Sequence, residues 1–340
     1  MPVAPEVLVH FNLFFTVLVV GGIAAGLYGF LPISLILTYR ISRTIAFVHG
    51  GIAALGAILY WILSLHNDFF PDFIITFSQS RDPKTFGRRP RWDAFPSMLF
   101  VVALGAVLGG GYGFIVMSRR FASLTVLTLT IVSLGAMMGL VGIASLTNVE
   151  PDVIAGSPFG SGRHKVLPES MTDHQPLLIT NNQIFTFCTV VGLSVVLAVF
   201  LTRTHTGLVI RALADDQEAG VWCGVKLRAV GTFVYATSGA IAALAGVLTS
   251  VTIGANPADM LVFLLDGLAI AIVGGLRSLP LAFLGALFYG LTDTALKVGF
   301  FGDVSPPLQA VVLYGLLLSI IVVAARLRRD SFFLLERQSL

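Results

Sequence analysis

The stretch "VGTFVYATSGAIAALAGVLTSVTI", residues 230–253, contains no charged side chain. About 20 consecutive apolar residues are enough to cross the hydrocarbon core of a bilayer as a helix. The stretch therefore predicts a membrane-spanning helix. It is also rich in Gly, Ala and Ser, like "GGIAALGAIL" at 50–59, and such small residues let helices approach each other closely in lipid.

The composition of the whole chain is that of an integral membrane protein. Of its 340 residues, 56% are hydrophobic and 11% are charged, and the mean hydropathy is +0.90. Soluble proteins carry about 25% charged residues. The apolar runs have the length of helices rather than of barrel strands. We therefore predict an all-α fold, a polytopic membrane helix bundle that forms one transmembrane domain over residues 1–340. The net charge of +3 fits basic loops at a membrane surface and suggests no nucleic-acid partner.

Helix-length apolar runs predict about nine crossings. They lie at roughly 12–39, 45–64, 97–117, 122–146, 184–201, 230–253, 260–275, 280–298 and 307–325. Around Gly274 and Gly275, one segment could re-enter the membrane instead of spanning it.

The basic residues of the connections predict the orientation. They fall in alternate connections, at Arg40, Arg43, Arg119, Arg120, Arg203, Arg211, Lys226, Arg228, Arg277, Arg326, Arg328 and Arg329. Short cytoplasmic loops carry an excess of Lys and Arg, so the N-terminus is expected outside and the C-terminus in the cytoplasm. Residues 65–96 and 147–183 then form extracytoplasmic loops, and 203–229 a cytoplasmic loop. The basic 65–96 segment departs from the rule, which long loops follow less strictly.

The cytoplasmic loop contains the most charged stretch of the chain, "RALADDQEAGVWCGVKLRAV" at 211–230. We expect a short helix over 211–224. Its acidic residues lie within an otherwise basic face, and Val221 and Trp222 add apolar surface beside them. This combination suits docking into a groove on a partner protein, although a solvated connector is the alternative.

Three stretches carry a resemblance to a known family. The segment "TRTHTGLVIRALADDQEAGVWCGVKLRAVGTFVYATSGAIAALAGVL", 202–248, resembles the signature region of branched-chain amino acid ABC transporter permeases. Within it "EAGVWCG", 218–224, is similar to the E-A-A-x-x-x-G loop of importer permeases, with Gly220 in place of the second Ala. "IAFVHGGIAALGAIL" at 45–59 and "IVGGLRSLPLAFLGALFYGLTDTAL" at 272–296 are similar to two further family motifs. Ala46, Arg277 and Leu281 depart from those motifs and leave the substrate open.

The resemblance implies a transport subunit and not an enzyme, located in a bacterial inner membrane. It would carry branched-chain amino acids or a related small polar solute. The loop would be the coupling helix that contacts the ATP-binding subunit, through Arg211, Asp215, Asp216, Glu218, Ala219, Gly220 and Gly224. The chain contains no G-x-x-x-x-G-K-[ST] motif, so ATP would bind to separate ATP-binding cassette subunits. The resemblance further implies an extracytoplasmic solute-binding protein and a second, related permease, which favours a heterodimer.

Ionisable residues within the spans are the candidates for a solute pathway, because a charge inside a membrane is costly. Asp266 interrupts an apolar run, and an interfacial position at a span end is the alternative. Asp293 is four residues before Lys297, which favours a local pair. His49 is equally compatible with a pathway role and a structural one. If Asp266 and Asp293 relay protons or ions, the chain would instead be a coupled secondary transporter. No His and Cys spacing predicts a metal site.

Two glycine pairs allow opposite interpretations. Gly21–Gly22 and Gly274–Gly275 are either breaks in a helix, where backbone groups could meet a solute, or tight helix crossings.

Overall fold

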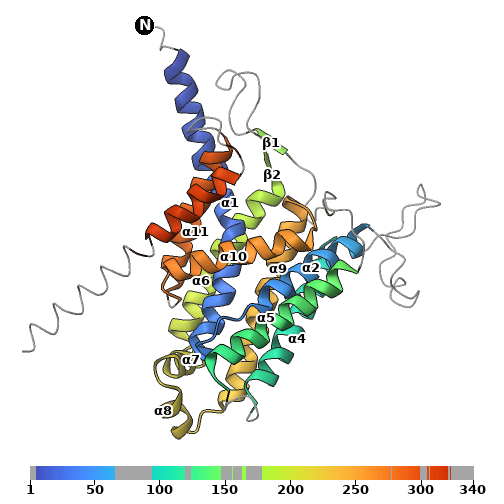
Figure 1. Ribbon diagram of the computed structural model, residues 1–340, viewed down its shortest axis with the longest axis vertical. Helices are drawn as coiled ribbons and strands as arrows, with labels where there is room; N and C mark the ends of the chain where they lie inside the picture. Colours follow the sequence, from blue (N-terminus) through green and yellow to red (C-terminus); the bar gives the residue numbers. More distant parts are fainter. Residues whose placement is uncertain are drawn as a thin grey trace, which may run out of the picture.

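The computed structural model describes residues 5–65, 94–118, 124–146, 155, 163–165, 178–276, 278–298, 305, 307–320 and 322. Most of the two predicted extracytoplasmic loops, and all of the basic segment 326–340, lie outside these residues. The described part is a helix bundle with a small pair of strands (Figure 1).

The helices follow the apolar runs of the sequence. They are α1 (Pro5–Ser42), α2 (Val48–Leu65), α4 (Ala94–Val116), α5 (Val126–Ser145), α6 (Asn181–Arg203), α7 (His205–Asp215), α8 (Gln217–Trp222), α9 (Leu227–Thr252), α10 (Pro257–Val273) and α11 (Leu279–Lys297). A further apolar helix covers Pro307–Ile320. Strands β1 (Arg163–Lys165) and β2 (Leu178–Thr180) pair antiparallel, with Arg163 opposite Thr180. The sequence had not predicted this strand pair.

Each of the nine predicted runs overlaps a helix of the described structure, but fewer of these helices are long enough to span the membrane. Within the described residues, six helices have the length and hydropathy of a membrane span: those at Phe14–Ser42, Phe95–Val116, Val126–Ser145, Asn181–Arg203, Leu227–Thr252 and Leu279–Lys297. The helices in the runs 45–64, 260–275 and 307–325 are shorter. The molecule is therefore a polytopic membrane bundle, and its described residues contain six candidate spans, where the sequence predicted about nine.

Helix α1 passes through Gly21–Gly22 without a break, so of the two interpretations the discontinuity is excluded at this pair. Gly21 instead marks a tight crossing, because a Cβ on it would lie 2.9 Å from the Cα of Leu291 on α11. Gly290 faces α1 in the same way, with Ala25 as its neighbour. The second pair, Gly274–Gly275, forms a turn between α10 and α11, with Gly275 at φ +66°.

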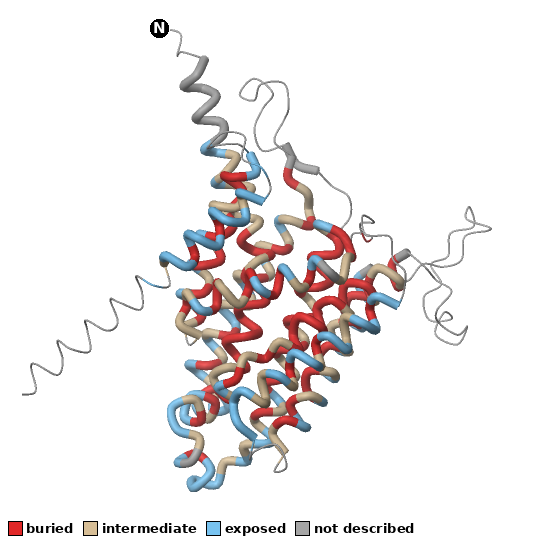
Figure 2. Tube along the Cα trace, viewed as in Figure 1, coloured by how far each residue is buried: buried red, intermediate tan, exposed pale blue. Residues whose placement is uncertain are grey.

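The tightest helix seam joins α4 to α9. Gly105, Gly109 and Gly113 follow one another at four-residue intervals along α4 and face Tyr235, Gly239 and Ala243 of α9. A Cβ on Gly109 would lie 2.9 Å from the Cα of Gly239. Since lipid offers no hydrophobic drive between helices, such close backbone contact is a main source of their association. The small residues of 230–253 thus place α9 inside the bundle, and most of its span is buried (Figure 2).

The two ends of the bundle differ. Helices α7 and α8 form one end, and the N-terminus of α1 lies at the other, near the strand pair (Figure 1). Residue Ala155 joins the predicted loop 147–183 to the end of α9 through a 3.0 Å hydrogen bond from its N–H to the Ser250 carbonyl. The exposed apolar side chains of α5, including Leu127 and Ile131, cover a face of the bundle suited to lipid.

Candidate functional site

The charged segment forms two helices, so the single helix predicted over 211–224 is wrong. Helix α7 ends at Asp215, Asp216 is extended, with φ −145° and ψ 112°, and α8 begins at Gln217. The Asp216 carboxylate accepts a 3.1 Å hydrogen bond from the Ala219 N–H. Asp is a favoured residue at a helix N-cap because its side chain satisfies a backbone N–H that lacks a partner within the helix. Asp216 therefore ends one helix and caps the next.

Two glycines give the α7–α8 unit its shape. A Cβ on Gly220 would lie 2.6 Å from Cδ2 of Leu213, so glycine lets α8 fold back against α7. Gly224 has φ +85°, the left-handed region in which a β-carbon is unfavourable. Nothing lies within 4 Å of a Cβ built there. The backbone conformation, and not crowding within this chain, therefore requires glycine at residue 224.

The α7–α8 unit is tied to the C-terminal end of α1. The Arg43 guanidinium donates hydrogen bonds to the carbonyls of Ala214 (3.3 Å) and Asp215 (2.9 Å). These carbonyls lie at the C-terminal end of α7, where a cation also interacts favourably with the helix dipole. The Gln217 side-chain amide donates to the Ile41 carbonyl. Arg43 itself has φ 53°, an uncommon backbone conformation for a residue with a side chain.

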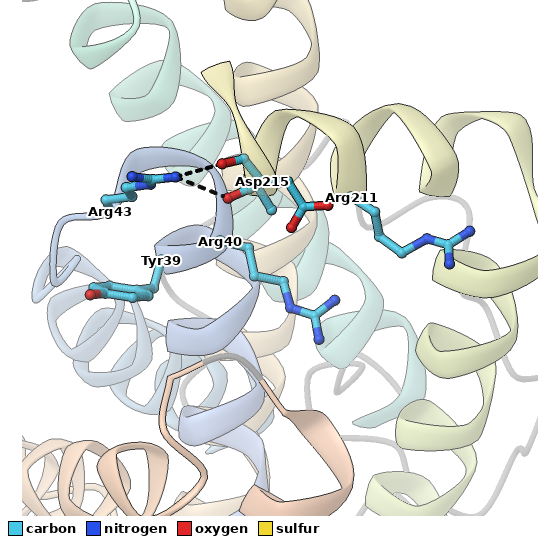
Figure 3. Close-up of a pocket in the computed structure, with 6 residues that line it drawn as sticks. Tyr39, Arg40, Arg43, Arg211 and Asp215 are labelled. Carbon is cyan, nitrogen blue, oxygen red and sulfur yellow. Dashed lines mark hydrogen bonds between the residues drawn. The ribbon is translucent and has the colours of Figure 1, made fainter. Parts of the chain in front are cut away.

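The predicted coupling residues divide between two sides of this unit. Asp216 and Ala219 are exposed, next to the apolar side chains of Val221 (49% exposed) and Trp222 (88% exposed). Arg211 and Asp215 are also exposed, and they line a cavity between α7 and the end of α1 (Figure 3). The side chain of Glu218 lies outside the described structure. The unit thus combines a solvent-exposed apolar tip with exposed charged side chains next to the end of α1.

Asp266 is buried, with 5% of its surface exposed, in the interior of α10. It therefore lies away from both ends of this helix. The Tyr314 hydroxyl donates a 2.6 Å hydrogen bond to its Oδ1, and Tyr289 is a second hydrogen-bonding neighbour. Hydrogen bonds to a charged group compensate the cost of burying it. Two tyrosines from separate helices thus stabilise the carboxylate.

Asp293 and Lys297 form the predicted pair, with Nζ 2.7 Å from Oδ2. Asp293 also accepts a 3.2 Å hydrogen bond from the Tyr28 hydroxyl. The Tyr28 ring contacts that of Tyr289, at 4.6 Å between centroids, which connects the Asp293 and Asp266 sites. Asp293, Lys297 and Tyr28 line a cavity of about 260 Å³ among α1, α6, α9 and α11. The remainder of this cavity is mainly apolar.

His49 is fully buried near the start of α2. Its Nδ1 lies 2.8 Å from the Ala46 carbonyl, and its ring stacks on Tyr235 of α9 with 6.0 Å between centroids. Within the described structure, Nε2 has no hydrogen-bond partner. The hydrogen bond and the ring contact of His49 thus go to Ala46 and Tyr235, and not to Asp266 or Asp293, which the sequence had grouped with it.

The sequence of this chain is similar to that of a known protein family. A family model described as branched-chain amino acid transport system / permease component matches residues 15–322. The chain belongs to this permease family. Membership assigns it to transport rather than to catalysis.

Two characterised relatives indicate how distant the similarity is. The permease protein BraD of Pseudomonas aeruginosa, from a high-affinity branched-chain amino acid transport system, is 29% identical over 140 residues, 41% of this chain and 43% of BraD. LivH of Escherichia coli strain K12, described in the same words, is 26% identical over 196 residues, 56% of this chain and 60% of LivH. The permease chain thus spans about half the length of the curated relatives it matches. No solved structure matches it significantly.

The sequence had missed three tyrosines of the permease, Tyr28, Tyr289 and Tyr314. Tyr28 and Asp293 are 265 positions apart, and Tyr314 and Asp266 are 48 apart. No local pattern joins residues at such separations. Only the chemistry of the residues could have indicated these contacts. A buried carboxylate needs hydrogen-bond donors, and the hydroxyl of a tyrosine within an apolar helix is such a donor.

Proposed function

We propose that this permease is the membrane-spanning subunit of an ATP-driven importer and that it carries branched-chain amino acids or a related small polar solute. The observation that carries the proposal is the exposed tip of α8. Trp222 is 88% exposed there, beside Val221. Trp is enriched among the residues that dominate binding energy at protein interfaces. The printed names of BraD and LivH support the substrate class.

ATP-binding cassette subunits would dock on the tip of α8 and bind the ATP. Asp216, Glu218 and Ala219 would contribute the polar and small contacts around Trp222. Gly220 and Gly224 would act indirectly, because they set the fold of α8 against α7. The Arg211 and Asp215 side of the unit would follow the movement of the tip through α7.

In this proposal the α7–α8 end faces the cytoplasm, and residues 203–229 form the cytoplasmic coupling loop. The charges of this end support that orientation, since an excess of Lys and Arg marks cytoplasmic loops. Its basic residues are Arg40, Arg43, Arg203, Arg211, Lys226 and Arg228. The N-terminus and the loops 65–96 and 147–183 would face outward, and the C-terminus inward, in a bacterial inner membrane.

The cavity beside Asp293 and Lys297 would form part of the solute pathway. It is built from the end of α9 and the beginning of α6, far from the α7–α8 end along both helices. An extracytoplasmic solute-binding protein would deliver the solute to this end, and Asp266 would line the path deeper in the bundle. His49 would contribute at a separate position, beside α9. A second, related permease would complete the translocation unit as a heterodimer.

Co-purification and uptake test the proposal together. We expect Trp222→Ala to weaken binding of the ATP-binding subunit by about thirtyfold, since truncation of an interface hot spot costs about 2 kcal/mol or more. Uptake into vesicles that contain the complete transporter should fall in parallel. Val196→Ala on α6 is the matched control, because Val196 is a similarly exposed apolar residue at 63%.

Equal retention of the ATP-binding subunit by the Trp222→Ala and Val196→Ala variants would argue against docking through α8. Proton-dependent uptake by the purified chain alone, without an ATP-binding subunit, would favour the secondary transporter with Asp266 and Asp293 as relay groups.

A further inference from the structure

The cavity of about 260 Å³ beside Asp293 lies where the ends of three helices meet. Thr294 and Lys297 belong to the last turn of α11, Thr252 ends α9, and Gln183 lies in the first turn of α6. The C-terminal end of a helix favours a cation and the N-terminal end favours an anion, because the peptide dipoles align along the helix axis. The cavity therefore offers one favourable position to a positive group and another to a negative group.

Asp293 and Lys297 form an ion pair, but each keeps hydrogen-bonding capacity for a ligand. The Lys297 ammonium and the Tyr28 hydroxyl both donate to Oδ2 of Asp293, at 2.7 and 3.2 Å. Within the described residues, Oδ1 of Asp293 therefore has no hydrogen bond. An ammonium group has three donors, so Lys297 keeps two. Both side chains line the cavity and are partly exposed, Asp293 by 14% and Lys297 by 58%, so a ligand can reach them.

A ligand that carries both charges on one carbon matches this pair. The ammonium of an α-amino acid would donate to Oδ1 of Asp293, and its carboxylate would accept from the free N–H groups of Lys297. Each charge of the solute would then face an opposite charge, and the ion pair of the protein would stay intact. Hydrogen bonds between charged groups are shorter and stronger than those between neutral groups. A solute with a single charge could form only half of these contacts.

Helix α1 supplies the cavity with an apolar wall. The residues of this wall follow one another at three- and four-residue spacing, on one face of the helix: they are Val20, Ile23, Ala24 and Leu27. An apolar side chain of the solute gains free energy by leaving water here, whereas a charged side chain would lose its hydration without gaining a partner. The volume is slightly below the roughly 300–1,000 Å³ of pockets for drug-sized ligands, so the cavity suits a small solute.

We propose that this cavity is a binding site for a zwitterionic α-amino acid, with the solute ammonium on Asp293, the solute carboxylate on Lys297 and the solute side chain against α1. The proposal rests on the proposed function and narrows its solute. Small polar solutes that lack either charge are excluded, and so are amino acids with a charged side chain.

Three compounds test the recognition of the two charges separately. They are L-leucine, 4-methylpentanoate, which lacks the ammonium, and 3-methylbutylamine, which lacks the carboxylate. Binding of each to the full chain, purified in a neutral detergent, is measured by isothermal titration calorimetry. We expect the wild type to bind leucine at least about tenfold more tightly than either analogue, since each analogue loses one contact between charged groups. This preference tests the proposal even where a variant does not fold.

Substitutions of the ion pair should change the preference in opposite directions. Lys297→Met removes the contact to the solute carboxylate, so leucine should bind no more tightly than 3-methylbutylamine. Asp293→Asn removes the contact to the solute ammonium, so leucine should bind no more tightly than 4-methylpentanoate. Melting temperatures check that each variant is folded. A pair with a structural role alone would lower the melting temperature without such a reciprocal change of preference.

Asp259→Asn is the matched control for Asp293→Asn. Asp259 is an exposed carboxylate in the first turn of α10, a short distance along the chain from the end of α9, and it does not line the cavity. Its substitution should leave the binding of all three compounds unchanged. Equal losses in the two Asp→Asn variants would overturn the proposal, as would equal binding of leucine and either analogue by the wild type, or no binding of leucine.

Uptake by the complete transporter separates this proposal from the proposed function. ATP-dependent uptake of leucine together with unaltered preferences in both ion-pair variants would overturn the binding site and leave the importer in place. The reciprocal change of preference in the purified chain, together with uptake that needs no ATP-binding subunit, would support the binding site and contradict the importer.

Discussion

Arg43 shows how one residue can connect the charged loop to the membrane bundle. Its guanidinium contacts the carbonyls of Ala214 and Asp215, 171 and 172 positions away along the chain. We expect Arg43→Ala to destabilise the end of α7 by about 1 kcal/mol, the ordinary net contribution of a hydrogen bond. Amide hydrogen exchange over residues 205–222 should become about fivefold faster. Arg43→Lys keeps the charge and one donor and should show a smaller change, whereas equal exchange in all three proteins would contradict this role.

Asp266 offers a second prediction for a single residue. Tyr314→Phe removes the donor to the buried carboxylate, and a buried group left without its partner costs about 1–3 kcal/mol. Asp266→Asn retains an oxygen that accepts from Tyr314, so its effect on stability should be smaller. Melting temperatures in detergent will show which of the two variants is less stable.

If Asp266 lines the solute pathway, Asp266→Asn should also slow uptake while assembly and basal ATPase activity stay near normal. Normal uptake would restrict Asp266 to a structural role.

The sequence could predict a contact between two residues only where they are close along the chain. The pairing of Asp293 with Lys297 follows from their four-residue spacing on a helix, and the structure confirms it. The partners of Asp266 could not be predicted, because Tyr289 and Tyr314 meet it only through the packing of three helices. The burial of Asp266 likewise depends on helix Pro307–Ile320, which supplies Tyr314.

Among the helices, boundaries were predicted well where composition alone decides them. The bounds of the uncharged run 230–253 are close to those of α9, which spans Leu227–Thr252. The division into α7 and α8 was missed because good helix formers lie on both sides of Asp216, in "RALA" at 211–214 and "QEA" at 217–219. It results from the Asp216 cap, a local contact that the sequence could have indicated, and from the contact between Gly220 and Leu213, which depends on how α8 folds against α7.

The seam between α4 and α9 gives a prediction for two packed helices. Gly109→Ala adds a Cβ that would lie 2.9 Å from the Cα of Gly239, so the helices must separate. Overpacking of this kind costs about 1–3 kcal/mol, which should appear as a lower melting temperature in detergent. Gly111→Ala is the control on the same helix, because nothing lies within 4 Å of its Cβ. It should be neutral or slightly stabilising, since Ala favours a helix over Gly. Equal melting temperatures for the two variants would exclude close packing at Gly109.

For the whole molecule, α1 is the element that connects the two functional ends. Tyr28 lines the cavity beside Asp293, and the end of the same helix is tied to α7–α8 by Arg43 and Gln217. Helix α1 therefore connects the proposed docking unit to the proposed solute cavity, and we expect a movement of one to displace the other. This connection couples ATP binding to transport only if the two ends of α1 face opposite sides of the membrane.

Cysteine labelling tests that arrangement. Cys223, at the end of α8, is exposed and unpaired, so it can be labelled without a new mutation there. In a Cys188→Ser background, we expect an impermeant maleimide to label Cys223 in inside-out vesicles and not in intact spheroplasts. Cys223→Ser combined with Ser161→Cys, in the same background, should give the reverse result, because 147–183 is predicted outside. Permeabilised cells supply the control for reactivity, since the thiol of either variant should label there. Labelling of both variants from the same side of an intact membrane would contradict the topology, and with it the proposal that α8 meets a cytoplasmic ATP-binding subunit.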